Sequence, residues 1–355
     1  MHRRDFLRTS SLAAAVLGAK AANAPVGGSA PPTITRTLEL TLASPWKPGS
    51  GGYPDQTHNF AKRLEGALGG RLKLHLETRA QSAIDAVGSG ASDLYFGPEH
   101  ANVVHHPGFA YFAGLPGDTA ADQATLEMWL TAGAGQELWD ELSGKFGVKA
   151  LMAGHTGPGP GFWSTRPIRA LSDIANTTIY VEGLAREVVR GLGAQAADLA
   201  PDQVAGNLAR RAIFAAEWGN PAQSLAAGFP SIAKFCTQTS INQQGHVLAL
   251  TISRPVWDRL TPDVQITLSA AAAEECRRAT ADCKANDMIL RRALSETLQI
   301  AFRALPKDLE TAISRVSEAV IADSATFDRL SARINDDYVH SLRPHLARRS
   351  AGQAV

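Results

Sequence analysis

The sequence has few cysteines and little scope for disulfides. Of its 355 residues only three are Cys, and a small odd number does not build a disulfide framework. Cys276 and Cys283 lie in a stretch that reads as helix, where seven positions separate them by roughly 10 Å, too far for a bridge. We therefore expect Cys236, Cys276 and Cys283 to be small buried hydrophobic residues.

Long hydrophobic runs and an excess of positive charge are also missing. No stretch approaches the ~20 apolar residues that span a bilayer. The net charge is +1, and without residues 1–24, which carry +3, it would be −2. Nucleic acid is not an expected partner, because phosphate binding needs a concentrated basic surface.

Recognisable catalytic motifs are absent as well. There is no G-x-S-x-G elbow, H-E-x-x-H pair, Walker loop or dinucleotide-binding glycine fingerprint. His100, His105 and His106 cluster, but with Glu99 as the only adjacent acid and no cysteine nearby they favour a surface loop over a metal site. The sequence predicts no cofactor and no metal.

The first two dozen residues have the layout of a twin-arginine export signal. Arg3-Arg4 precede Phe6-Leu7, a short apolar run over 11–17 and an A-x-A cleavage site at 22–24. Cleavage after Ala24 would leave 331 of the 355 residues. We therefore expect 1–24 to be a signal peptide and the mature protein to be periplasmic; a cytoplasmic start with a chance Arg pair is the alternative.

Hydrophobic periodicity predicts an α/β rhythm that stops and restarts. Alternating or apolar runs predict strands at 37–42, 72–77, 92–96, 149–153, 177–181, 213–216 and 245–252. Helices are expected at 55–68, 82–87, 126–146, 184–192 and 204–211. The Gly- and Pro-rich stretch 154–163 suggests a crossover between lobes. From Thr261 a cap followed by proline opens a helix that keeps one apolar face over some 38 residues, roughly 57 Å.

A mature chain of this length exceeds the usual size of a single core, so two lobes are expected. We assign 33–157 with 245–270 to lobe 1, and 158–244 with 271–345, including the C-terminal helices, to lobe 2. The helices over 306–340 carry more apolar surface than a lone surface helix needs. Packing on the second lobe would explain this, and a homodimer is the alternative.

Aromatic and polar residues recur where the predicted strands end. In open α/β sheets ligands bind outside the carboxyl ends of the strands, so residues far apart in sequence would converge on one cleft. The candidate ligand-binding residues are Trp46, Glu99, His100, His155, Trp163, Tyr180, Glu182, Glu217, Trp218 and Asn220.

These features together resemble a known family. The stretch 154–218, which runs from GHTGPGPGFW to FAAEW, is similar to the central segment of the solute-binding proteins of TRAP transporters, the DctP family, nearest the branch that binds 2-oxo acids. Supporting matches are His106-Pro-Gly-Phe-Ala-Tyr-Phe-Ala-Gly-Leu-Pro116, Ser253-Arg-Pro-Val-Trp-Asp-Arg-Leu-Thr-Pro262 and the stretch 83–93. The resemblance covers nearly the whole mature chain.

The resemblance implies an α/β fold of the two-lobed periplasmic solute-binding type, with hinge strands, a long lobe-spanning helix and a helical C-terminus. It also implies that a small solute closes between the lobes and is delivered to the membrane subunits of a TRAP permease, without a reaction.

The departures from the family fall on the ligand site. Tyr180 stands where the family usually has an arginine that grips a carboxylate. The glutamine of the oxo-acid branch is missing from 155–163, whereas Glu217-Trp218 match. A metal-binding glutamate of that branch falls on Gln243, which joins the candidate ligand-binding residues.

These departures leave the ligand open. The solute is an organic acid, a neutral or differently charged molecule, or an acid whose cation comes from Arg166, Arg169 or Arg186. Two further interpretations of the chain stay open: an exported enzyme that uses His155 or the His100 cluster, and a receptor with a degenerate site used for sensing.

Overall fold

The computed structural model describes residues 37–47, 53–79, 81–118 and 120–350. The predicted signal peptide, 1–24, lies outside the described residues. None of the helices in these ranges has the length and hydrophobicity needed to cross a membrane.

The first sheet has five strands in the order β2-β1-β3-β10-β4. β1 (Leu38–Ser44) pairs in parallel with β2 (Leu72–Thr78) and β3 (Leu94–Pro98), while β10 (Val247–Ser253) runs antiparallel between β3 and β4 (Val148–His155). Leu40 and Leu42 of β1 are buried, as their alternation predicts. The predicted strand at 245–252 therefore does return to the sheet formed by the first half of the chain.

The second sheet has six short strands in the order β11-β9-β5-β8-β6-β7. They are β5 (Phe162–Ser164), β6 (Thr178–Tyr180), β7 (Gln195–Ala196), β8 (Ala215–Glu217), β9 (Phe235–Thr237) and β11 (Ala301–Arg303). Two separate sheets, each with its own apolar clusters, confirm the predicted two-lobed α/β fold.

Two irregular segments connect the sheets. The first, 156–161, leads from β4 to β5, as the glycines and prolines of 154–163 predict; the second, 238–246, leads from β9 back to β10. Gly161 has a φ of +110°, and a Cβ there would lie 2.2 Å from the Thr237 carbonyl oxygen. Only glycine lets the backbone before β5 lie this close to the backbone of β9.

Twelve α-helices surround the sheets in the described residues. Their bounds are α1 Tyr53–Ala67, α2 Ala110–Ala113, α3 Gln123–Ala132, α4 Gly135–Gly144, α5 Ala185–Gly191, α6 Pro201–Ala209, α7 Pro221–Ala226, α8 Phe229–Ile232, α9 Arg254–Arg259, α10 Pro262–Arg292, α11 Lys307–Ala325 and α12 Arg329–Ser350. The expected helix at 82–87 is a single π-helical turn, Ile84–Gly88.

The prediction of a single helix over 126–146 is wrong, because α3 and α4 are separate helices. The chain bends tightly around the buried Trp129, and a Cβ at Gly133 would lie 2.8 Å from the Trp129 carbonyl oxygen. A Cβ at Gly135 would lie 2.7 Å from the Trp129 ring. The two glycines allow the turn, a packing effect that periodicity along the chain does not reveal.

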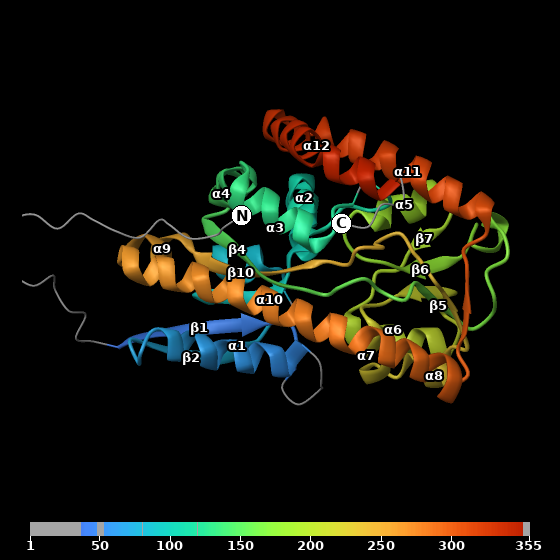
Figure 1. The fold of residues 1–355 in the computed structure, drawn as a ribbon, viewed down its shortest axis with the longest axis horizontal. Coiled ribbons are helices and arrows are strands. Elements are labelled where there is room, and N and C mark those ends of the chain that lie inside the picture. The colour runs from blue at the N-terminus through green and yellow to red at the C-terminus, as the bar shows by residue number, and fades with distance from the viewer. Residues whose placement is uncertain (1–36, 48–52, 80, 119, 351–355) are drawn as a thin grey trace, which may run out of the picture. The chain divides into compact units, whose positions relative to one another are not determined.

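The long helix α10 contacts both lobes, as predicted (Figure 1). It packs on β4 and α1 of the first lobe and on α7 of the second, and continues as a π-helical turn over Ala293–Thr297. Thr261 precedes Pro262 at the expected start, but the Thr261 hydroxyl donates to Asp263 Oδ1 at 2.5 Å rather than capping the backbone.

The two C-terminal helices together pack on both lobes, and Ile321 of α11 belongs to the cluster around Trp129. In α11, Leu309 and Ile313 join the core of the second sheet, on α5. In α12, Leu330, Ile334 and Tyr338 join the core around Trp129, between α3 and α4. The predicted lobe boundaries, including 271–345 in lobe 2, stay a prediction, and α12 contacts the core around Trp129.

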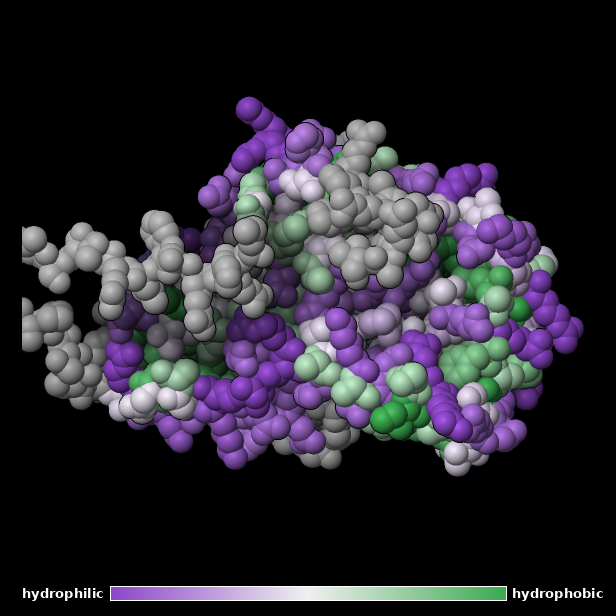
Figure 2. Space-filling model, in the orientation of Figure 1, coloured by the Kyte–Doolittle hydropathy of each residue, from purple (hydrophilic) through white to green (hydrophobic). Residues whose placement is uncertain are grey.

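Hydrophobic side chains at the surface are scattered. On the face shown in Figure 2 they form small patches among hydrophilic residues, mostly over the region where α7, α8 and the end of α10 lie in Figure 1. Exposed examples on α10 are Ile266, Met288 and Ile289.

Cys236 and Cys276 are buried as expected, but Cys283 is only half-buried. Its Sγ lies 3.6 Å from the Thr156 carbonyl oxygen, beside the first connecting segment.

Candidate functional site

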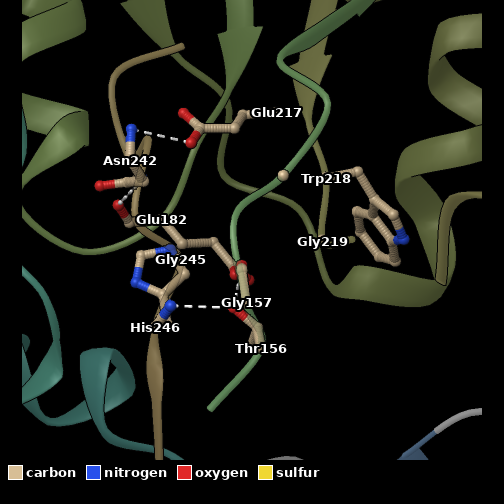
Figure 3. A pocket seen from close by; sticks show the side chains of 10 residues that line it. Thr156, Gly157, Glu182, Glu217, Trp218, Gly219, Asn242, Gly245 and His246 are labelled. Atoms are coloured by element: carbon tan, nitrogen blue, oxygen red, sulfur yellow. Dashed lines mark hydrogen bonds between the residues drawn. The ribbon is translucent and has the colours of Figure 1, made fainter. Parts of the chain in front are cut away.

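A small cavity of about 30 Å³ lies where the connecting segments pass the ends of β6 and β8. Its walls come from these strand ends and from both connecting segments (Figure 3). The lining residues are Thr156, Gly157, Gly159, Glu182, Glu217, Trp218, Gly219, Asn242, Gly245 and His246. The cavity therefore forms where the strand-end rule expects a ligand, and it suits a solute of few atoms.

Glu182 is held from both lobes. The Tyr180 hydroxyl donates to its Oε1 at 2.6 Å, and His100 Nε2, from the turn after β3, lies 3.0 Å from its Oε2. Burial alone would raise the pKa of Glu182, but the charge and hydrogen bond of His100, together with Tyr180, lower it to about 2. Glu182 is therefore an anion in the cavity wall.

His246 brings a second imidazole to this group. Its ring lies 4.5 Å from the His100 ring, and its backbone N–H donates to Thr156 Oγ1 at 2.8 Å. Burial, and then the charge of His100, lower the pKa of His246 to about 3, so it stays neutral near pH 7. One ligand atom from each of His100, Glu182 and His246 lies within 4.8 Å of the others, a spacing at which the three side chains could hold a metal ion.

Glu217 is the second carboxylate of the cavity. Its Oε1 accepts from Ser240 Oγ at 2.9 Å and from the Asn242 backbone N–H at 2.8 Å. Its Oε2 is buried without a hydrogen-bond partner among the described residues. Burial raises the pKa of Glu217 to about 7. None of the described residues that line the cavity is Lys or Arg, so the protein places two acidic groups there without a cationic side chain.

Trp218 provides the aromatic part of the wall. Its ring centroid lies 6.0 Å from that of Tyr180 and 5.2 Å from that of Phe229. In Figure 3 the indole lies apart from the group formed by Glu182, Glu217 and His246. The indole therefore packs against the second-lobe core around Tyr180 and Phe229, while Trp218 also lines the cavity.

The structure brings together five of the residues predicted from sequence. Glu182, Glu217 and Trp218 line the cavity, and His100 and Tyr180 contact Glu182 directly. The residues that sequence reasoning missed include Thr156, Asn242, Gly245 and His246. Thr156 and His246 lie where the chain crosses between the sheets, so the crossover pattern was a signal that could have found them.

Three predicted residues belong to the interior instead. Glu99 accepts from Trp139 Nε1 and Asn102 Nδ2, both at 3.0 Å, and burial raises its pKa to about 8. The fully buried Trp163 donates to Ser224 Oγ at 3.2 Å. His155 Nδ1 accepts from the Gly157 N–H at 3.1 Å, and burial lowers its pKa to about 4. None of the three is among the lining residues.

Three more have structural contacts outside the cavity wall. Trp46 stacks on Tyr53 with ring centroids 4.7 Å apart. Asn220 caps α7 and donates to the Thr156 carbonyl oxygen at 2.9 Å, which ties the second lobe to the first connecting segment. Gln243 donates to Asp118 Oδ1 at 3.3 Å on the surface.

The three arginines considered as an alternative source of the cation, Arg166, Arg169 and Arg186, do not line the cavity either. Arg166 lies over the Phe214 ring at 4.6 Å. Arg186 donates to the Ala197 carbonyl oxygen at 2.8 Å. Arg169 is likewise absent from the wall.

Two lobes, two connecting segments and a cavity between strand ends define a solute-binding protein. Residues 52–328 match the bacterial extracellular solute-binding proteins of family 7 (DctP), and the chain belongs to that family. It is accordingly a periplasmic receptor that binds a small-molecule solute for TRAP transport, and not an enzyme.

Several proteins are similar to this chain in sequence or in fold. The chain is 24% identical, over 279 residues that cover 77% of this chain and 76% of the relative, to a monocarboxylate 2-oxoacid-binding periplasmic protein of Nostoc sp.. A TRAP solute-binding protein from Pseudoalteromonas atlantica, with bound sodium and pyruvate, has a TM-score of 0.83 at 23% identity and covers 90% of this chain and 98% of its own. A TRAP solute-binding protein from Bordetella bronchiseptica, a dimer with calcium and picolinate in one site, has a TM-score of 0.83 at 18% identity. The match covers 89% of this chain and 95% of the Bordetella chain.

Proposed function

We propose that the protein binds a small organic acid of few carbon atoms in the cavity between its lobes. The observation that carries this proposal is the cavity itself, about 30 Å³ and lined by hydroxyl, amide, imidazole and carboxyl groups at the strand ends. Relatives of the same fold are described as binding 2-oxo acids, pyruvate or picolinate. A cavity this small has no room for an oligosaccharide or a peptide.

Thermal-shift measurements on the mature protein test the proposal. Pyruvate, malonate and picolinate form the acid panel, and glycerol and 2-amino-1-propanol serve as neutral and cationic comparisons. An acid at 100 times its Kd should raise stability by about 2.7 kcal/mol. A shift with the neutral or cationic solutes and none with any acid would contradict the proposal.

Delivery to a TRAP permease is the second part of the proposed function, supported by membership of the family. Vesicles that contain the permease should accumulate a labelled ligand only when the receptor is added. Uptake at the same rate without the receptor would show that delivery is not its role.

The N-terminal leader is proposed to direct export through the twin-arginine route. Replacing both Arg3 and Arg4 by Lys should leave the precursor in the cytoplasm. Normal periplasmic accumulation of this double variant, measured by fractionation and immunoblotting, would contradict the proposed route.

We still propose a homodimer, but the apolar helix surface that suggested it no longer supports it. The apolar residues of α11 and α12 that suggested it, such as Leu309 and Ile334, are buried within the chain itself. The remaining support is the dimer described for the Bordetella relative. Light scattering at tens of micromolar decides: the mass of one chain excludes the dimer, and twice that mass supports it.

A further inference from the structure

We propose that His100, Glu182 and His246 form a binding site for a divalent transition-metal ion of the zinc type, and that this ion supplies the cation for the carboxylate of the solute. The second half rests on the proposed function; the first half does not. The site draws on both lobes, because His100 follows β3 of the first sheet and Glu182 follows β6 of the second.

The three side chains are close to metal-binding distance. Around a tetrahedral ion with bonds of about 2.0–2.1 Å, ligand atoms lie roughly 3.3 Å apart. His100 Nε2 and Glu182 Oε2 are already 3.0 Å apart, and all three ligand atoms lie within 4.8 Å of one another. The ion would therefore have to draw the widest pair of ligand atoms together by at most about 1.5 Å, within reach of a side-chain rotation.

The backbone supports this approach of the lobes. Gly183, directly after Glu182, has a φ of +61°, and a Cβ there would lie 3.3 Å from His100 Cβ. A glycine at this position lets the strand end of the second sheet come up against the turn that carries His100. The close approach is thus built into the local geometry rather than left to two long side chains.

The donor set favours transition metals over the ions described for the relatives. Sodium and calcium, present in the Pseudoalteromonas and Bordetella proteins, prefer oxygen ligands. Two imidazoles and one carboxylate suit zinc, nickel or cobalt. Three protein ligands also leave at least one coordination position open, and Glu182 and His246 both line the cavity where a solute would enter.

Charge balance gives the ion a role in binding. The cavity wall holds Glu182 and Glu217, and its described lining includes no Lys or Arg. Tyr180, which stands where the family has an arginine, donates its hydroxyl hydrogen to Glu182 and brings no charge. A free carboxylate would meet two acidic groups there. A divalent ion held by Glu182 and the two imidazoles would make this part of the cavity positively charged, and it could bind the solute carboxylate directly.

Metal binding is measured with ZnCl₂ alone on tag-free mature protein that has been stripped with EDTA and dialysed. Calorimetry should show one equivalent of tight binding, and Co²⁺ should give a visible absorption band in its place. His100→Gln and His246→Gln should each weaken binding at least tenfold. His58→Gln, which alters an exposed histidine on α1, should not. Circular dichroism confirms that each variant is folded. Absence of tight zinc binding, or equal binding by all variants, would overturn the site.

The role of the ion is tested with pyruvate and malonate, titrated into zinc-loaded and EDTA-treated protein. Affinity for the acid that binds should fall at least tenfold without metal. Equal affinity in both conditions would overturn the role of the ion while leaving the proposed function intact. Zinc binding that depends on His100 and His246, with no acid bound in either condition, would support the metal site and contradict the organic-acid ligand.

Discussion

At the scale of single residues, two tryptophans of the second lobe have different surroundings. Trp163 is fully buried among Phe229 and its neighbours, and its Nε1 has a buried hydroxyl partner, Ser224. Trp218 is half-buried, lies beside Tyr180 and Phe229, and lines the cavity. The first serves the core, and the second is placed to contact a solute.

Trp218→Ala should weaken ligand binding by at least ~1 kcal/mol, because a large flat aromatic contact is lost at the cavity wall. Trp163→Phe is the matched control. It leaves the Ser224 hydroxyl unpaired and should cost roughly 1–3 kcal/mol of stability without changing the Kd. Calorimetry and thermal unfolding separate the two effects, and a change in Kd at Trp163 equal to that at Trp218 would mean that the cavity is wrongly placed.

At the scale of elements, the two connecting segments touch each other through glycine. Gly245 has a φ of +84°, and a Cβ there would lie 2.1 Å from the Gly157 carbonyl oxygen. Gly228, with a φ of +77°, has open space around the same position. The two sites differ in crowding while sharing the left-handed backbone.

Gly245→Ala should therefore destabilise the protein more than Gly228→Ala. The control loses only what the left-handed conformation costs, about 1–2 kcal/mol, whereas Gly245→Ala must also push the connecting segments apart. Urea denaturation of both variants measures the difference. Equal losses of stability would show that the connecting segments move apart at no cost and are not held in close contact.

Asp328 fastens the start of α12 to the first lobe. Its Oδ1 accepts from the Ser331 N–H at 2.7 Å, and its Oδ2 lies 3.1 Å from both His106 Nε2 and Lys145 Nζ. Burial alone would raise the pKa of Asp328, but these partners outweigh it and hold the pKa well below the ordinary 3.8. The ionised carboxylate is thus favoured in the folded state.

Asp328→Asn keeps a helix cap but removes the charge, so it should cost about 1 kcal/mol at pH 7. A depressed pKa stabilises the fold above the unfolded value, and this contribution is lost as the carboxylate is protonated. The difference in the free energy of unfolding between wild type and Asp328→Asn should therefore be constant above about pH 5 and should become smaller below about pH 4. Denaturation across this range measures it, and a gap that persists at low pH would contradict the ionic explanation.

At the scale of the whole molecule, contacts across the cavity link the two sheets. His100 on the first side meets Glu182 on the second at 3.0 Å, and the two connecting segments are joined by the bond from His246 N–H to Thr156 Oγ1. A solute between these groups would hold the lobes together. Opening would break a few polar contacts and leave each sheet with its own core.

We therefore expect the radius of gyration to fall when the cognate solute binds, with the motion taken up by 154–161 and 243–246. Small-angle scattering with and without ligand measures this, and an equal concentration of a solute that does not bind is the control. A tight ligand that leaves the radius unchanged would indicate a rigid cleft.

Much of the fold could be read from local pattern. Alternation at Leu40 and Leu42, helical spacing of Phe60 and Leu64, and the glycines and prolines after His155 each express a local rule, and the structure agrees with them. The break between α3 and α4 could not be read this way, because Trp129 imposes it through contacts that periodicity does not encode.

The sequence by itself determined all five strands of the first sheet, the crossover and the family, since burial periodicity, turn residues and family motifs are properties of neighbouring positions. The short strands β5, β7, β9 and β11 of the second sheet were not predicted. Only the tertiary structure decided which strand-end residues face the cavity. Glu99 and His100 are adjacent in sequence, yet one accepts from Trp139 in the core and the other meets Glu182 from the opposite lobe. Side-chain direction at a strand end depends on what packs against it, and His246 joins the site only because β10 returns to the first sheet.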